Sequence, residues 1–526
     1  MRYDVIIRNA KIIDGTGNPW FSGEIGIKDG RILSLGRKIP HEAIESVDAG
    51  GMMVCPGFID AHTHSDFVFF IDPSAQSKVR QGVTTEVTGN CGMSGSPLSG
   101  AARYMAAHLA RDFSPSWTTV QEYLTLLSRQ PKTTNLAPLI GHMNLRAGML
   151  GMDDRQPKPK ELDEMKGMLA DGLDAGAFGF SMGLYFAPGN YAKKDEIVAM
   201  VATAGEHDLV TTAHIRDEGV RTVGFVPAVR EFIEAGREAA APIHISHLKA
   251  FGPDVWGAST EVLDIIDGAR AEGIDVTCDQ YPYTASGGLM AADVIPTSFV
   301  KGKSPEEVSG MMKEEKYRSQ VIERVGINIR KRGGADRLTI ANYPFDHSLE
   351  GKTLQQIADE RGKDTAEVLL DMISDYYDGS WTCESMSRED VDRIIRYPFT
   401  MVGSDGSSIS TEGPLSSGNP HPRNFGAFPR VLSEFVRDRS VLRLEEAVRK
   451  MTSLPAKRFS ILHRGMLEEG YWADIVLFDL GSIKDAGFEN PKQYPSGIPY
   501  VMVNGEWVIK KDEFTGALPG RLARRR

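Results

Sequence analysis

The sequence is poor in cysteine. Its 526 residues include only Cys55, Cys91, Cys278 and Cys383, which are widely spaced and form no CxxC pair. A chain of this length buries a core large enough to be stable without disulfides. Scattered single cysteines are typical of a reducing compartment. The pattern excludes a disulfide-stapled scaffold and predicts a cytoplasmic protein.

Long apolar runs are missing as well. No stretch reaches the roughly 18 consecutive apolar residues that a membrane-spanning helix needs. The opening MRYDVIIRNAKIIDG has the pattern of a strand and not of a charged-then-apolar signal peptide. We therefore expect no membrane partner.

A concentration of positive charge is the third missing feature. The formal net charge is −11, and no basic stripe runs through the body of the chain. Nucleic-acid-binding proteins carry a basic surface for the phosphates, so we expect no nucleic-acid partner. The terminal RLARRR is basic but short, and such an end is typical of a frayed tail.

The two ends of the chain have β patterns. Near the start, VIIRNAKII and GEIGIKDGRILSLG are short β-branched runs, with Asp29 and Gly30 at a hairpin turn. Near the end, ADIVLFD and VMVNGEWVIKK are again strand-like, with Asn504 and Gly505 at a turn. We expect residues 1–54 and 464–526 to form one small β domain together.

Strand and helix patterns alternate between these ends. Eight strands alternating with helices predict an α/β fold with a parallel sheet, and the count favours a closed (β/α)₈ barrel, which we place in residues 55–463. The predicted strands are MMVCPGFIDAHTH, TTEVTGNCG, NLAPLIGHMNLR, AFGFSMGLY, LVTTAHIRDE, PIHISHLK, GIDVTCDQYPY and FTMVGSDG.

One connection is too long for a simple barrel. The seventh and eighth predicted strands are separated by residues 285–396, about 110 residues where a few suffice. We interpret this segment as a partly helical insertion that forms a lid over the barrel mouth.

Side chains suited to metal binding fall where the predicted strands end. In a (β/α)₈ barrel, catalytic groups come from the carboxyl ends of the strands. His62 and His64 are two apart and point to the same side of a strand. The other strand-end residues of this kind are Cys91, His142, His214, His247 and Asp405.

Some of these residues have plainer interpretations. His244 and His247 lie three apart and face opposite sides of a strand, so we expect His247 to face the site and His244 to pack in the core. Cys91, flanked by Gly89, Asn90 and Gly92, is either a ligand or a small buried apolar residue. Asp405 is either functional or a turn residue before Gly406.

Several imidazoles with a thiolate or carboxylate form a zinc-type ligand set. Zinc lowers the pKa of bound water from about 15.7 to about 7, and it polarises carbonyl groups. A nearby carboxylate can then move the proton to a departing nitrogen, and Asp405 is our candidate. The pattern therefore predicts a hydrolase.

These residues lie in stretches that resemble the D-aminoacylase (N-acyl-D-amino-acid deacylase) family of the amidohydrolase superfamily. The stretches include GFIDAHTHSD, GVTTEVTGNCG, GHMNLR, AFGFSMGLYFAPG, TTAHIRDEG, ISHLKAFG, DQYPYTA, VGSDG, HPRNFGAFPRVL and TGALPGR, and they cover nearly the whole chain. The resemblance implies a TIM barrel, a small β-sandwich from both termini, an inserted lid, and cleavage of N-acyl-D-amino acids to a carboxylate and a free D-amino acid.

The resemblance also implies roles for single residues. Cys91, His214 and His247 would hold one Zn²⁺ tightly. His62, His64 and Asp405 would form a second, weaker zinc site, with Asp405 as the general base and acid. Lys249 and Tyr281 would bind the substrate α-carboxylate, since an ammonium and a phenol suit that group. Tyr185 would assist at the scissile carbonyl.

Arg216 is a further candidate at the rim, where an ion pair with Asp217 or Glu218 is an equal alternative. The chain reads HTHSD and SHLK where many relatives read HTHDD and SHHK. These departures leave the expected metal ligands in place. They bear on which amino-acid side chain the substrate carries.

Two alternatives remain open at this point. The barrel could open cyclic amides, as hydantoinases and dihydropyrimidinases do, or cleave another amide. It could also be a non-catalytic scaffold without metal, although the full ligand set argues against this. We expect a small-molecule substrate; the oligomeric state, a homo-oligomer included, is left open.

Overall fold

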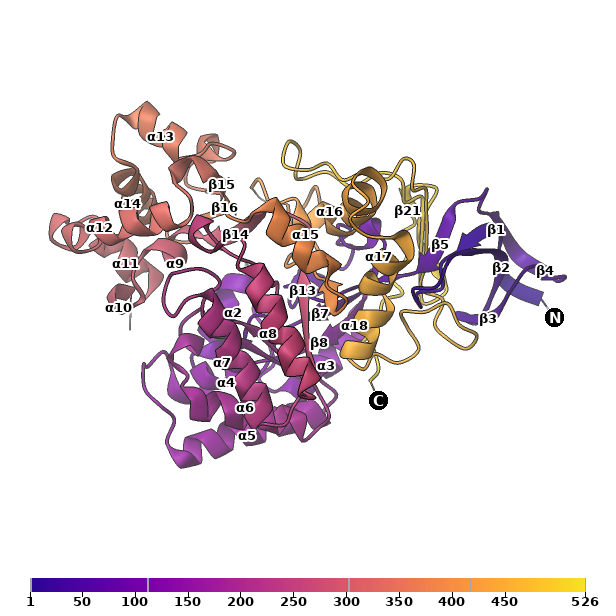
Figure 1. Cartoon of the computed structure of the whole chain (residues 1–526), viewed down its shortest axis with the longest axis horizontal. Helices are drawn as coiled ribbons and strands as arrows, with labels where there is room; N and C mark the ends of the chain where they lie inside the picture. Colours follow the sequence, from indigo (N-terminus) through magenta and orange to yellow (C-terminus); the bar gives the residue numbers. More distant parts are fainter. Residues whose placement is uncertain (1, 111–112, 301–302, 417, 526) are drawn as a thin grey trace.

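The computed structural model describes residues 2–110, 113–300, 303–416 and 418–525. Figure 1 shows a central barrel with a helical insertion at one end of the long axis and a sheet from both chain termini at the other. Within these ranges, no helix combines the length and the apolar composition that a membrane span requires.

The predicted (β/α)₈ barrel is confirmed. Neighbouring strands pair in parallel, and the barrel closes where Ala61 N donates to Val402 O (3.3 Å) and Asp405 N to His62 O (2.9 Å). In the described part of the chain, the eight barrel positions are β6 (Phe58–Asp60), β7 (Val83–Thr88), β8 with β9 (Asn135–Pro138, Ile140–Gly141), β10 (Phe180–Gly183), β11 (Thr211–His214), β12 (Ile243–Ile245), β13 (Val276–Gln280) and β17 (Thr400–Val402).

Two predicted strands differ in detail. The first splits at Gly57, because β5 (Met53–Pro56) pairs with the terminal strands and only β6 enters the barrel. The third ends at Gly141, where helix α4 begins with His142. Its buried ring lies 2.8 Å from Glu196 Oε1, so His142 belongs to a separate buried cluster.

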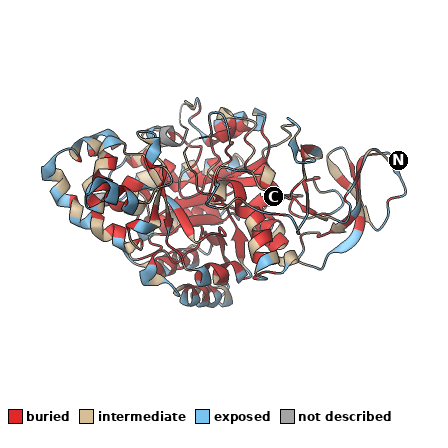
Figure 2. Cartoon of the chain, turned by 90° about the horizontal axis from the view of Figure 1, so that it is seen from above, coloured by how far each residue is buried: buried red, intermediate tan, exposed pale blue. Residues whose placement is uncertain are grey.

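Helices cover the outside of the barrel. Helix α8 shows why: Val262, Ile266 and Ala269, spaced four and three residues apart, are buried, whereas the polar residues between them face solvent. The covering helices are α1 (Val68–Ile71), α2 (Ala102–Ala110), α3 (Val120–Arg129), α4 (His142–Leu150), α5 (Pro159–Asp174), α6 (Lys194–Gly205), α7 (Phe225–Glu238), α8 (Ser259–Ala271), α15 (Arg388–Arg396), α16 (Arg423–Arg430), α17 (Leu444–Met451) and α18 (Ser453–Arg458). Buried residues gather in the barrel strands, as Figure 2 shows.

The termini share one sheet, which has nine strands within the described residues. Apolar side chains from both ends of the chain pack in a common core, among them Ile7, Ile25, Ile475 and Met502. The strands are β1 (Arg2–Ile12), β2 (Phe21–Lys28), β3 (Arg31–Gly36), β4 (Glu42–Asp48), β5, β18 (Ile475–Phe478), β19 (Tyr500–Val503), β20 (Glu506–Lys510) and β21 (Glu513–Phe514).

The long connection between β13 and β17 contains a unit with its own apolar core. It consists of β14 (Ala285–Leu289), α9 (Met290–Val294), α10 (Thr297–Val300), α11 (Pro305–Met311), α12 (Glu315–Lys331), β15 (Leu338–Asn342), α13 (Leu354–Arg361), α14 (Thr365–Asp375) and β16 (Ser380–Glu384). We call it the insert. Helix α15, which lies inside the predicted range 285–396, packs against α8, β13 and β17 as a helix of the barrel.

Candidate metal centre and active site

Residues from five barrel strands meet at the carboxyl-terminal mouth of the barrel. Each lies at the end of its strand or in the loop that follows, where (β/α)₈ enzymes carry their catalytic groups. They are His62 and His64 after β6, Cys91 after β7, His214 at the end of β11, His247 after β12 and Asp405 after β17.

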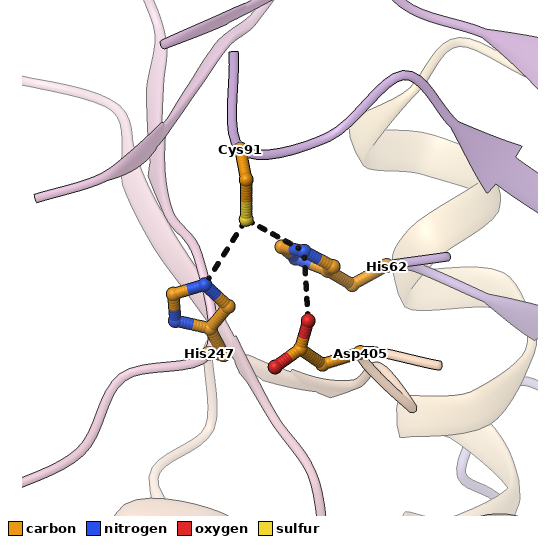
Figure 3. A group of neighbouring side chains, drawn as sticks. All are labelled: His62, Cys91, His247 and Asp405. Carbon is orange, nitrogen blue, oxygen red and sulfur yellow. Dashed lines mark hydrogen bonds and ion pairs between the residues drawn. The ribbon is translucent and has the colours of Figure 1, made fainter. Parts of the chain in front are cut away.

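Figure 3 shows the Cys91 thiol linked to both His62 and His247. Its Sγ lies 3.3 Å from His62 Nε2 and 3.2 Å from His247 Nε2. Asp405 Oδ1 lies 3.6 Å from His62 Nε2 and 3.1 Å from His64 Nε2. One ligand atom from each of His62, Cys91, His247 and Asp405 falls within 4.8 Å of the others. The thiol therefore contacts one histidine from each of the two zinc sites that the sequence predicts.

His214 completes a second group. Its ring centroid lies 4.5 Å from that of His247, and ligand atoms of His214, His247 and Glu218 also fall within 4.8 Å of one another. His214 Nε2 is buried without a hydrogen-bond partner among the described residues. A buried imidazole nitrogen needs a partner, and a metal ion would supply one.

The electrostatics favour the ionised ligands. Burial by itself raises the pKa of the Cys91 thiol, but His62 and His247 outweigh it and hold that pKa well below its ordinary value. Burial also opposes ionisation of Asp405, yet Arg423, 2.8 Å away, and His247 keep the pKa of this carboxyl well below its ordinary range. Thiolate, imidazole and carboxylate are the donors of zinc-type sites, so these residues fit a divalent metal ion.

Asp279 contacts two histidines of this region and holds the backbone of a third residue, His247. The sequence analysis did not identify it. Its Oδ2 lies 3.4 Å from His62 Nδ1 and 2.7 Å from His244 Nε2, and its Oδ1 accepts the His247 backbone N–H at 3.0 Å. The available signal was strand alternation, because Asp279 lies on the same face of its strand as Tyr281. His244, expected to pack in the core, is buried there but also binds this carboxylate.

Glu218 and Lys249 form a second support. Glu218 Oε1 lies 2.9 Å from His247 Nδ1 and 2.5 Å from Lys249 Nζ. The Lys249 ammonium is also 2.7 Å from the same ring nitrogen. Sequence reasoning considered Glu218 only as a partner of Arg216. In the structure it contacts a ligand histidine and a predicted substrate-binding lysine.

The Cys91 loop has a conformation that its neighbours hold in place. Cys91 itself adopts a positive φ of 54°. Gly92 has a φ of 77°, and a Cβ there would lie 2.4 Å from the backbone of Gly183, so this position requires glycine. Asp66 accepts the backbone N–H groups of Gly89 (3.2 Å) and Gly95 (2.9 Å). These contacts aim the thiol at the histidines.

A cavity of about 720 Å³ lies between the cluster and the insert. Tyr281, Tyr185 and Lys249 all line it. The Tyr281 hydroxyl is buried without a hydrogen-bond partner in the described structure, and the Tyr185 ring lies 5.1 Å from that of His214. Three of the four predicted substrate-binding side chains therefore face the same space as the metal cluster.

Arg216 is the exception. It does not line this cavity. Its Nε donates to Glu231 at 2.9 Å, and its other nitrogens donate to the carbonyls of Asn190 and Ala192. Neither of the ion pairs considered from sequence forms, because the side chain turns toward helix α7. We withdraw its assignment to the substrate site.

Comparison with known proteins identifies the family to which this chain belongs. The amidohydrolase family profile matches residues 45–292 and 352–509. An N-acyl-D-glutamate deacylase of Alcaligenes xylosoxydans xylosoxydans is 35% identical over 100% of this chain and 97% of its own length. The chain belongs to the D-aminoacylase family of amidohydrolases. A D-aminoacylase of the same organism is 34% identical, over 99% of this chain and 98% of its own.

Solved structures agree with this family. The N-acyl-D-glutamate deacylase of Bordetella bronchiseptica, crystallised with zinc and a phosphonate mimic of the tetrahedral intermediate, has a TM-score of 0.84 and 33% identity over 100% of both chains. The L-hydantoinase of Arthrobacter aurescens has a TM-score of 0.60 at 18% identity, over 99% of this chain and 100% of that one. This second likeness concerns the fold alone. Residues 293–351, which lie in the insert, fall outside the amidohydrolase family profile.

Proposed function

We propose that this protein is a zinc-dependent hydrolase that cleaves the linear amide of N-acyl-D-amino acids into a carboxylate and a free D-amino acid. The observation that carries the proposal is that ligand atoms of His62, Cys91, His247 and Asp405 lie within 4.8 Å of one another. The last three of these residues also line the cavity. The similarity to a D-aminoacylase and to an N-acyl-D-glutamate deacylase over the whole chain supports it.

The resemblance to D-aminoacylases suggests how zinc would be held. Cys91, His214 and His247 would bind one ion tightly, and His62, His64 and Asp405 would form a weaker second site. When bound, zinc would polarise a carbonyl oxygen and increase the acidity of water.

Asp405 would move the proton. Its carboxylate is kept ionised by Arg423 and the neighbouring histidines, so at neutral pH it can accept a proton from the attacking water. The same group can then donate that proton to the nitrogen of the departing amine. Its Oδ1 faces the two β6 histidines, whereas its Oδ2 faces Arg423, which fixes the carboxylate toward the metal cluster.

The cavity wall would bind the amino-acid part. The unpartnered Tyr281 hydroxyl can donate a hydrogen bond to the α-carboxylate, and the Lys249 ammonium lies 5.6 Å from the Tyr281 ring. The Arg423 guanidinium also lies 5.1 Å from the centroid of the same ring. Tyr185, beside His214, would act at the scissile carbonyl.

We also propose that the protein acts in the cytoplasm on this small-molecule substrate. The four cysteines are all free and buried, which agrees with a reducing compartment. Immunoblotting of membrane, periplasmic and cytosolic fractions of the source cells tests this, and recovery outside the cytosol would contradict it.

A substrate panel tests the activity. Matched N-acetyl-D- and N-acetyl-L-amino acids, hydantoin and dihydrouracil are assayed with zinc supplied, together with Cys91→Ala and Asp405→Ala. We expect hydrolysis of the D-series, loss of tightly bound zinc in Cys91→Ala, and loss of activity with zinc retained in Asp405→Ala. Preferred opening of the cyclic amides would replace the proposal. Absence of both zinc and activity after reconstitution would favour the scaffold alternative.

A further inference from the structure

Three buried charged residues lie behind the metal cluster without belonging to it. They are Asp60 at the end of β6, Lys78 in the connection between β6 and β7, and Glu86 on β7. All three are fully buried, and none is among the described residues that line the cavity. Burial raises the pKa of the Glu86 carboxyl, and Lys78 acts against that rise. Apolar residues stabilise a core as well as buried charges do or better, which points to a role besides stability.

Lys78 joins the two strand ends at which the barrel closes. Its Nζ lies 3.0 Å from Asp60 Oδ2 and donates a hydrogen bond to Ser404 Oγ. Asp60 Oδ1 in turn accepts the backbone N–H groups of His62 at 3.2 Å and of Ser404 at 2.8 Å. The ion pair therefore fixes the start of the loop after β6 to the start of the loop after β17.

Ser404 carries this constraint to Asp405, the next residue in the chain. Its Oγ accepts the backbone N–H of Gly406 at 3.2 Å and lies 3.3 Å from the carbonyl oxygen of His62. The same carbonyl accepts the Asp405 backbone N–H at 2.9 Å. Asp405 has a positive φ of 51°, a conformation that persists in a non-glycine residue where its surroundings hold it. Hydrogen bonds on both sides hold it here.

Glu86 joins the same two loops further along the chain. Its Oε2 accepts the hydroxyl of Ser65, which follows His64, at 2.5 Å, and its Oε1 accepts the hydroxyl of Ser408 at 2.8 Å. The Ser408 backbone N–H donates to Ser65 Oγ at 2.8 Å. Oε1 also accepts the hydroxyl of Thr134, which precedes β8, at 2.7 Å. One carboxylate thus holds both loops against the adjoining strand.

We propose that Lys78 and Glu86 are positioning residues for the second, weaker metal site. They hold the loop that carries Asp405 against the loop that carries His62 and His64, and so set the distances among these three side chains. The inference rests on the proposed zinc-dependent function. The ligands of the tight site come from strands β7, β11 and β12, and their loops make none of the hydrogen bonds described above. A change in this network should therefore weaken the second site and leave the tight site in place.

Three variants break the network without leaving a lone buried charge. Glu86→Gln keeps the shape of the side chain and leaves Lys78 paired with Asp60. Lys78→Met with Asp60→Asn removes that ion pair as a unit. Ser404→Ala keeps the ion pair and removes the hydroxyl that it holds, so it tests the same link if the double variant does not fold.

Zinc titration of the metal-free proteins, with a competing chelator, separates the two binding steps. We expect the dissociation constant of the weaker step to rise by about 10- to 100-fold in each variant, as for other supporting contacts of metal ligands, and the tighter step to stay nearly unchanged. With one equivalent of zinc, kcat should fall by about 10- to 100-fold with little change in KM, because Asp405 is displaced and the substrate contacts are not.

Glu196→Gln is the matched control. Glu196 is also buried, and it pairs with His142 and Arg146 on helix α4. Its loss leaves a buried guanidinium without its carboxylate, so urea unfolding should show at least as large a loss of stability as in Glu86→Gln. Both zinc steps and kcat should match those of the wild type.

The outcomes separate the two proposals. If the three network variants keep the weaker zinc step and kcat of the wild type, or if Glu196→Gln lowers both equally, the positioning role is overturned while the deacylase function stands. If no N-acyl-D-amino acid is cleaved, the proposed function fails, and if the wild type binds no second zinc, the second site fails.

In either of those last two cases, hydrogen–deuterium exchange of the metal-free proteins decides the positioning role. Residues 61–66 and 403–409 should exchange faster in Glu86→Gln and Ser404→Ala than in the wild type and in Glu196→Gln. Equal exchange in all four proteins would overturn the inference.

Discussion

Replacing Asp279 by asparagine should weaken metal binding although Asp279 is no ligand itself. The fully buried carboxylate joins His62 Nδ1, His244 Nε2 and the backbone N–H of His247. By accepting from His62 Nδ1, it leaves the other ring nitrogen, Nε2, facing the Cys91 thiol as a ligand. It also sets the backbone at His247, which adopts a φ of 34°.

The size of the effect follows from these contacts. Asparagine keeps the shape but replaces one oxygen by an NH₂ group. If the amide oxygen stays on His247 N–H, the NH₂ group faces both rings and favours the wrong His62 tautomer. Loss of such a supporting partner lowers metal affinity by about 10- to 100-fold, or about 1.4 to 2.7 kcal/mol. In the metal-free protein, exchanging charged for neutral hydrogen bonds should lower the free energy of unfolding by about 1 to 3 kcal/mol.

Two measurements check this prediction. Competition with a chelator of known affinity gives zinc binding, and urea unfolding of the metal-free protein gives stability. Thr277→Val is the control. Thr277 lies on the same strand as Asp279, and its hydroxyl lies 2.8 Å from His244 Nδ1. The substitution should therefore cost about 1 kcal/mol of stability and leave zinc affinity nearly unchanged. An Asp279→Asn protein that binds zinc as tightly as the wild type would refute the reasoning.

Three further predictions concern the proton carrier, the substrate and a buried lysine. Asp405→Asn should lower kcat by about 10²- to 10⁴-fold while the tightly bound zinc remains; a loss below tenfold would remove it as the proton carrier. Tyr281→Phe removes a hydroxyl that has no partner among the residues the structure describes, so the Tm should hold or rise while KM for N-acyl-D-amino acids increases about tenfold. An unchanged KM would contradict its role. Burial lowers the pKa of Lys450 to about 8, below the roughly 10.4 of a lysine in the unfolded chain. Between these two pH values the unfolded state binds more protons than the folded state. Lys450 therefore makes the free energy of unfolding rise with pH from about 8 to about 10. Lys450→Met should flatten that rise in urea-unfolding measurements, and an equal slope in both proteins would show that the lysine is not desolvated.

Most of the barrel and the ligand residues could be predicted from sequence because both depend on short-range patterns. The eight strand positions follow from runs of apolar residues, and the placement of His62, Cys91, His214, His247 and Asp405 at strand ends follows from where those runs stop. The splitting of the first strand at Gly57 could not be predicted, because β5 and β6 are chemically alike and only their pairing partners, β18 and β7, separate them.

The supporting contacts were beyond sequence reasoning for a different reason. Asp279 reaches His62 across 217 residues of chain, and Arg423 reaches Asp405 from a helix after the eighth strand. Such pairs depend on the conformation of each loop. Tertiary packing determines that conformation, and the periodic pattern of the local sequence does not. The same holds for Arg216, whose position at a strand end suggested the cavity but whose side chain turns outward to Glu231.

The sequence alone identifies which chemical groups this protein can use: imidazoles, one thiol and a carboxylate, each at the end of a barrel strand. Which of these groups meet depends on tertiary contacts: the thiol lies between two histidines, and a buried aspartate orients them. Strand identity is encoded within a few neighbouring residues, whereas these contacts exist only once the barrel closes.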